Sequence, residues 1–553
     1  MALLVHAGAA GQAASGANWD GHLIWALPFD NNSAQPGLDW IGASFPDILN
    51  QRLSSAGFLT IRREDRRYAW KHLGLPAGFH PTLATTYRLA QTLDADYVIL
   101  GSYTVAQGRI VATARVLAMH GLRIQAPLQE QGDLAQLLTV ENTLAWRVAK
   151  QIDPSLQLDK QTFVAASHDL RLDAFENYIR GETEPGSDEQ ISHLSKAVAI
   201  SPNYVQAWLA LGNAYFASQQ YQQAEAAYAK VPRGNRLSLE ALFYSGLSYL
   251  YTGNYAKAQA KFSTIASVLP MPEVLNDEGV AINRRGQDGT ALFQRVVELN
   301  PQNADSWFNL AVSLRRRKNY AAALKAVDRC LELHPEDEEA QNLKKNLQEL
   351  LNAPIPVDAD VSATSVAANS AELAAQQAAP AGQPASAAAA AAETPAYEPL
   401  ERIARSYDES SFRQAAFEME QMNALKLRSM PPAQQAKLLN QQGTAYVRDG
   451  LLLEAERQFQ LALAADPKSS AAFAGLAQVH EYVGDPVTAR QEANTSLELQ
   501  PNVASYLVLA RLAVGQRDWP GAREYVAKAL QLDPKNSAAK GILQAVDMQQ
   551  GKP

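Results

Sequence analysis

The sequence predicts a mainly α fold in which two arrays of repeated helical hairpins follow a small α/β domain. Two observations predict the arrays: prolines that follow helix-like segments recur every 33 or 34 residues, and Gly-x-x-Tyr words recur at the same interval. A third predicts the α/β domain, because residues 20–153 alternate short apolar runs with longer amphipathic segments. Repeats of this length indicate stacked helical units rather than one globular core.

The recurring prolines divide the repeats into two groups. Proline cannot continue a helix, so each is expected to end the second helix of a hairpin. The two groups of prolines indicate two arrays of repeats, the first over about 170–351 and the second over about 399–548. The prolines are Pro301, Pro335, Pro467, Pro501 and Pro534.

Other positions recur in register with these prolines. In the first helix of a repeat, a small residue lies between two bulky ones. In the second helix, a small residue is followed by an aromatic one. Small residues let paired helices approach closely, and bulky ones fill the space between repeats. These structural positions are Trp208, Gly212, Tyr215, Ala224, Gly246, Tyr249, Ala258, Phe262, Trp307, Gly443, Tyr446, Ala455 and Phe459. We expect Trp208 and Trp307 to be buried packing residues.

The pattern Trp-x-x-Leu-Gly-x-x-Tyr, which residues 208–215 carry in full, resembles the tetratricopeptide repeat family. The resemblance covers about two thirds of the chain and about nine hairpins. It implies an α-solenoid whose concave surface is lined by the first helix of each repeat. Degenerate repeats are expected at 173–202, 271–301 and 400–423.

Two segments do not fit either fold. Residues 352–396 are rich in Ala, Pro, Gln and Ser and poor in large apolar residues, which predicts a disordered linker between the arrays. Residues 1–19 are small and apolar, and we interpret them as a flexible tail or as the remnant of an export signal, since Ala7-Gly8-Ala9 is suitable for signal-peptidase cleavage.

The α/β domain is predicted to contain short strands and three helices. Helices are expected over 39–53, 82–93 and 133–152, and strands over 23–27, 58–61, 96–103, 109–116 and 122–124. The words Leu27–Asn31, Leu38–Gly42 and Ala95–Ser102 resemble the TolB amino-terminal-like domain, a relative of the CsgG and FlgO families. The resemblance implies a bacterial envelope or sensor protein.

The composition and motifs exclude several classes of function. A formal net charge of −8 disfavours nucleic acid, since phosphate binding needs a basic face. The sequence carries no recognisable catalytic, metal or nucleotide motif, so we expect neither an enzyme nor a cofactor. No apolar run is long enough to span a bilayer. Cys330 occupies a small-residue position of a repeat, which predicts core packing.

The concave surface of the first array is the predicted binding site. Family geometry places there an apolar and aromatic set that would bind an apolar protein or peptide segment. The alternative is that the same residues pack against the α/β domain or a neighbouring repeat. The run Arg315–Lys318 is either solvated or contacts an acidic partner. The predicted groove residues are Leu209, Asn213, Phe216, Phe243, Leu247, Leu250, Tyr251, Phe308, Val312 and Arg315.

These observations predict a protein-interaction scaffold or adaptor in or near a bacterial envelope, either periplasmic or associated with the cell envelope. The alternative function is the sensory module of a signalling system, and the alternative location is the cytoplasm. The oligomeric state is open.

Overall fold

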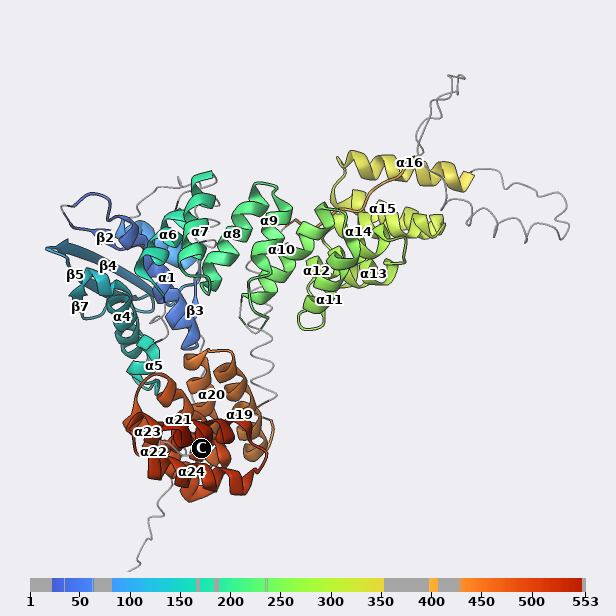
Figure 1. Ribbon diagram of the computed structural model, residues 1–553. Helices are drawn as coiled ribbons and strands as arrows, with labels where there is room; N and C mark the ends of the chain where they lie inside the picture. The colour runs from blue at the N-terminus through green and yellow to red at the C-terminus, as the bar shows by residue number, and fades with distance from the viewer. Residues whose placement is uncertain are drawn as a thin grey trace, which may run out of the picture. The chain divides into compact units, whose positions relative to one another are not determined.

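The computed structural model describes residues 22–33, 35–61, 63, 82–165, 170–183, 188–233, 235, 237–352, 397–405, 427 and 429–549. The predicted tail over 1–19 and, apart from Asn352, the predicted linker over 352–396 lie outside these ranges. The chain forms two compact units, Met1–Ala241 with Asp408–Pro553, and Leu242–Tyr407. The predicted mainly α fold, with repeat arrays and a small α/β region, is confirmed (Figure 1).

The first unit begins with a mixed sheet in the order β3-β1-β4-β5-β6, with β2 also paired to β4 and β7 to β5. Strand β1 is parallel to β3 and β4, whereas β4 and β5 form a long antiparallel hairpin. Gln107 and Gly108 connect that hairpin, and both have positive φ, as a tight two-residue turn favours. The strands are β1 (Leu23–Ala26), β2 (Asp30–Asn31), β3 (Leu59–Thr60), β4 (Tyr97–Ala106), β5 (Arg109–Ala118), β6 (Arg123–Ile124) and β7 (Leu128–Asp133).

Helices cover both faces of this sheet. Ile24 and Ile99 belong to the core that contains residues of α1 (Trp40–Ser55) and α4 (Leu137–Ile152). Trp25 and Val98, each one position away, pack in the core that contains residues of α3 (Leu83–Thr92). Burial on both faces explains why the strands have continuous apolar runs rather than alternating ones.

The sequence did not predict β2 or β7, and the helix expected over 133–152 begins later. Strand β7 reads Leu-Gln-Glu-Gln-Gly-Asp and alternates half-buried with exposed positions. Such a polar strand carries little hydrophobic signal, so its pairing with β5 decides its structure. A short 3₁₀ turn, η1 (Leu134–Gln136), separates it from α4.

Helical hairpins make up most of the other described residues of both units (Figure 1). Helix α5 (Lys160–Ala165) precedes them. The first unit contains α6 (Leu172–Thr183), α7 (Asp188–Ile200), α8 (Val205–Ala217), α9 (Tyr221–Tyr228), α19 (Pro432–Arg448), α20 (Leu452–Ala465), α21 (Ser470–Tyr482), α22 (Pro486–Leu499), α23 (Val503–Gly515), α24 (Trp519–Leu532) and α25 (Ser537–Gln549). The second contains most of α10 (Ser238–Tyr251), then α11 (Tyr255–Ala266), α12 (Pro272–Arg284), α13 (Thr290–Leu299), α14 (Ala304–Arg316), α15 (Tyr320–Leu333) and α16 (Glu338–Asn352).

Hairpins close where a glycine of the first helix meets an aromatic ring of the second. A Cβ atom on Gly246 would lie 2.7 Å from the Phe262 ring. The same closeness occurs in the short repeat over 271–301, where a Cβ on Gly279 would lie 2.9 Å from the ring of Phe293. Since only glycine leaves room at such distances, these residues fix how closely the paired helices approach.

The two repeat tryptophans, predicted to be buried, are only half-buried. The indole N–H of Trp208 donates to the carbonyl of Pro202 at 2.8 Å, and that of Trp307 donates to the carbonyl of Pro301 at 3.0 Å. Each indole is therefore held against the turn before its own helix and leaves part of its ring open to solvent.

Candidate functional site

Residues 397–405 lie as an extended segment against the first helices of the repeats in the second unit. The segment has no helix or strand of its own, and residues 406–423 of the degenerate repeat expected over 400–423 lie outside the described residues. Its contacts come from α12, α14 and the start of α16. We call these contacting faces, together with Asp337 just before α16, the α12–α16 groove.

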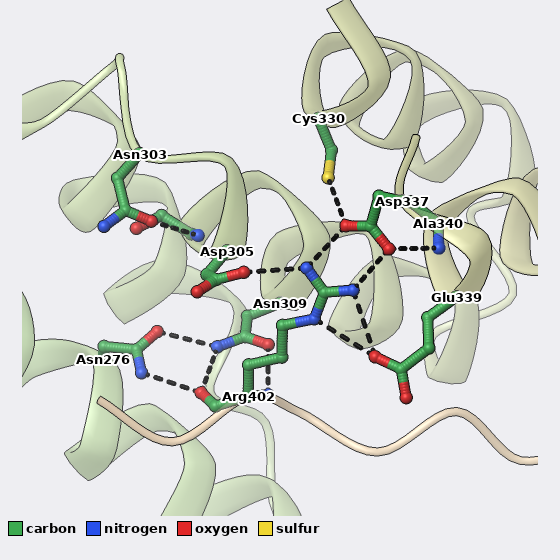
Figure 2. A network of polar contacts seen from close by, with 10 residues as sticks. Asn276, Asn303, Asp305, Asn309, Cys330, Asp337, Glu339, Ala340 and Arg402 are labelled. Carbon is green, nitrogen blue, oxygen red and sulfur yellow. Dashed lines mark hydrogen bonds and ion pairs between the residues drawn. The ribbon is translucent and has the colours of Figure 1, made fainter. Parts of the chain in front are cut away.

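Two buried asparagines hold the backbone of this segment (Figure 2). The Asn309 Oδ1 accepts the Arg402 N–H at 2.6 Å, and the Asn309 Nδ2 donates to the Arg402 carbonyl at 2.7 Å. Asn276 donates to the same carbonyl at 3.0 Å and accepts a bond from Asn309 at 2.8 Å. Asp277 accepts the N–H of Ala404 at 2.8 Å. These bonds recognise an extended backbone independently of its side chains.

The side chain of Arg402 enters a group of three carboxylates (Figure 2). Two guanidinium nitrogens each donate to Asp337 at 2.7 Å, one of them donates to Asp305 at 2.7 Å, and the other donates to Glu339 at 3.0 Å. The guanidinium also lies 3.9 Å from the centre of the Phe308 ring. Paired donors to one carboxylate and stacking on an aromatic ring are both properties of arginine that lysine lacks.

Burial and charge shift the pKa values of groups around Arg402. The hydrogen bonds from Arg402 lower the pKa of Asp337 below its ordinary value of 3.8. Burial raises the pKa of Asp277 well above that value, against the hydrogen bond from Ala404. Burial, with Asp337 nearby, raises the pKa of the Cys330 thiol to about 12, so the thiol stays protonated and unreactive at neutral pH.

The residue before Arg402 meets charges of the opposite sign. Glu401 is 3% exposed, and its carboxylate lies 2.8 Å from a guanidinium nitrogen of Arg316 and 3.8 Å from one of Arg284. Asn283 donates to the same carboxylate at 3.0 Å. A buried carboxylate is tolerated only with such partners. Arg316, in the basic run, therefore pairs with a carboxylate of the same chain, and an acidic partner for this run stays a prediction.

Exposure varies along the segment: its end residues Tyr397 and Arg405 are exposed, and so is Leu400 beside the buried Glu401. Arg315 donates to the carbonyl of Tyr397 at 2.7 Å and lies 5.7 Å from the centre of its ring. Leu400 is 63% exposed. An open groove borders residues 400–405, and its other lining residues are Tyr251, Pro272, Glu273, Asn276, Arg284, Asn303, Asp305, Ser306 and Glu339.

The predicted groove residues have several different environments. Phe308 and Arg315 contact the segment, and Tyr251 lines the open groove beside it. Asn213 accepts a hydrogen bond from Tyr228 at 2.8 Å, and Phe216 packs edge-on against Tyr221. The other predicted residues are buried: Leu209, Phe243, Leu247, Leu250 and Val312. A partner-binding role for the ten residues stays a prediction.

The polar residues that hold the segment were not predicted from the sequence. A signal for them exists, because Asn276 and Asn309 are 33 residues apart, as are Asn283 and Arg316. Equal offsets place such residues at the same position of successive repeats. The degenerate repeat over 271–301 obscured this register. The missed residues are Asn276, Asp277, Asn283, Asn309, Asp337, Glu339, Glu401 and Arg402.

The described ranges contain neither a metal cluster nor a membrane-spanning helix. Within them, no cluster of three or more His, Cys, Asp or Glu side chains has the arrangement of a metal site. No helix in the described part of the chain has both the length and the apolar character needed to cross a bilayer.

Family models for the tetratricopeptide repeat match residues 191–242, 240–268 and 283–338. The chain therefore contains tetratricopeptide repeats, as its sequence pattern predicted. The α12–α16 groove is built largely within the last of these matches. The resemblance of residues 20–153 to the TolB amino-terminal-like domain stays a prediction.

Individual relatives match parts of the chain. The Cell division cycle protein 16 homologs of Homo sapiens and Mus musculus are 31% and 30% identical over 160 residues, which cover 26% of this chain. The match spans 25% of the length of each of these relatives. One similar solved structure is that of YrrB, a TPR protein with an unusual peptide-binding site, which is 17% identical to this chain. The match covers 36% of this chain and 98% of YrrB, with a TM-score of 0.28. The LpoB C-terminal domain from Salmonella enterica is 13% identical; the match covers 20% of this chain and 83% of that domain, with a TM-score of 0.19.

Proposed function

We propose that this chain, through its tetratricopeptide repeats, is a protein-interaction scaffold whose α12–α16 groove binds an extended segment of a protein. The observation that carries this proposal is the recognition of the Arg402 and Ala404 backbone by Asn276, Asn309 and Asp277. Hydrogen bonds to main-chain groups supply affinity for extended peptides, and pockets for side chains supply specificity. Binding, rather than catalysis, is the activity that such an arrangement supports.

The chemistry of the groove favours a charged ligand over the apolar one expected from the sequence. Leu247, Leu250 and Val312 are buried, so they offer no free apolar surface in this state. The groups that meet the segment are carboxylates around Arg402 and guanidinium groups around Glu401. The proposed ligand is therefore an extended segment that contains glutamate followed by arginine.

A peptide titration tests this proposal. The receptor, called the freed receptor below, is the full chain with Glu401→Ala and Arg402→Ala, which removes the ion pairs that anchor the internal segment and leaves the walls of the groove unchanged. The probe is a fluorescent peptide with the sequence of residues 397–405, and fluorescence anisotropy reports binding. We expect saturable binding with a Kd on the order of 10 µM, as for interfaces of modest size.

The matched control is a peptide of the same composition in which the adjacent glutamate and arginine are exchanged. That exchange places each charge beside groups of the same sign, so affinity is expected to fall at least about tenfold. The proposal fails if a receptor with an unchanged melting curve binds neither peptide, or binds both equally.

We also propose a bacterial envelope location for the chain. Its support is the resemblance of residues 20–153 to the TolB amino-terminal-like domain, carried by words such as Leu27–Asn31. Fractionation of the native cells, with immunodetection of the untagged protein, tests the location. Recovery with cytoplasmic markers alone would contradict it.

A further inference from the structure

We infer that residues 397–405 act as an internal ligand of the α12–α16 groove, which a partner carrying the same Glu-Arg pair must displace. The inference rests on the proposed function, since it assumes that the groove binds peptides. It adds a regulatory element, because the chain itself then limits how readily a partner is captured.

Charges of opposite sign lie next to each other along the groove. Around Arg402 lie Asp305, Asp337 and Glu339, whereas Arg284 and Arg316 surround Glu401. The two groups serve adjacent residues, which in an extended chain are about 3.3 Å apart along its axis. A ligand must therefore present an acidic and a basic residue next to each other, in that order.

An empty groove would leave groups of like charge without a counter-charge. Without Arg402, the carboxylates of Asp305, Asp337 and Glu339 would face one another without a cation between them. Without Glu401, the guanidinium groups of Arg284 and Arg316 would lose the carboxylate they share. Like charges gathered at one place repel, so the groove favours an occupied state. Displacement consequently requires an incoming Glu-Arg pair rather than simple release.

The segment is covalently connected to the groove that it occupies. Asn352 ends α16, and residues 353–396 join it to Tyr397, so the segment belongs to the same chain as the groove. Tethered ligands act at effective concentrations that can reach about 1 mM. If a free peptide binds the empty groove with a Kd of about 10 µM, the internal segment then weakens its apparent binding by roughly 100-fold.

Three forms of the full chain test the inference with the labelled 397–405 peptide. The first is the wild type, and the second is the receptor with Glu401→Ala and Arg402→Ala. The third is a matched control with Glu398→Ala and Arg405→Ala, which also removes one acidic and one basic side chain from the segment. Neither Glu398 nor Arg405 forms an ion pair or side-chain hydrogen bond with any residue that the structure describes.

We expect the freed receptor to bind the peptide at least about tenfold more tightly than the wild type, and the control to match the wild type. Equal binding by the freed receptor and the wild type would overturn the inference while leaving the proposed function intact. No binding by any folded form would instead overturn the proposed function. Light scattering at the assay concentration completes the test by reporting the oligomeric state. A wild-type dimer that becomes monomeric with Glu401→Ala and Arg402→Ala would show that two copies exchange the segment. That result would also overturn the inference that the segment is an internal ligand.

Discussion

Replacing Asn309 with alanine should weaken the groove more than its small change in volume suggests. The substitution removes both hydrogen bonds to the Arg402 backbone, at 2.6 and 2.7 Å, and the bond to Asn276. A typical intramolecular hydrogen bond contributes about 0.5–1.5 kcal/mol, so the two bonds to the ligand amount to roughly 2 kcal/mol. That free energy corresponds to about a 30-fold rise in the Kd of the 397–405 peptide.

The assay uses the freed receptor with and without Asn309→Ala, and it has a control on the same helix. Asn303 caps α14 by accepting the N–H of Ser306 at 3.0 Å, whereas Asn309 binds the segment. Asn303→Ala should cost about 1 kcal/mol of stability and change peptide affinity by less than about threefold. Unchanged affinity with Asn309→Ala, or an equal loss with Asn303→Ala, would refute the reasoning.

Three further predictions concern pH and packing. Because the pKa of Asp337 is lowered, its contribution to peptide binding should be lost as the pH falls below 3.8, and Asp337→Asn should reduce that dependence in an anisotropy titration. Gly279→Ala should lower stability by about 1–3 kcal/mol in denaturant unfolding, since its Cβ would crowd Phe293; unchanged stability would contradict this. Burial raises the pKa of Glu456 to about 7, so stability should fall as the pH rises through that value. Glu456→Gln should flatten the dependence of the melting temperature on pH from about pH 5 to about pH 8. The same dependence in the wild type and in the variant would refute this.

The repeats could be predicted because their signal is local and periodic. Gly246 and Phe262 lie in one hairpin, and the same offset separates Gly443 from Phe459, where a glycine Cβ would again lie within 3 Å of the ring. Such a pattern repeats down the chain, so each instance supports the others. The polar strand β7 has no comparable signal, since its structure depends on pairing with β5.

The groove was predicted only in part, for a different physical reason. Helical spacing predicts that Phe308, Val312 and Arg315 share a face, and in the structure Phe308 and Arg315 contact the segment. What occupies that face depends on a contact between residues about 90 positions apart, such as Asn309 with Arg402. Periodicity carries no information about such a contact.

The most direct test of the account is amide hydrogen exchange of residues 397–405 in the unmodified full chain. The N–H of Arg402 is bonded to Asn309 and that of Ala404 to Asp277, so both should exchange far more slowly than in the free peptide. Glu401→Ala with Arg402→Ala should reduce this protection strongly, because the anchoring ion pairs are lost, while Glu398→Ala with Arg405→Ala should preserve it. Exchange in the wild type as fast as in the free peptide would contradict the presence of this segment in the groove.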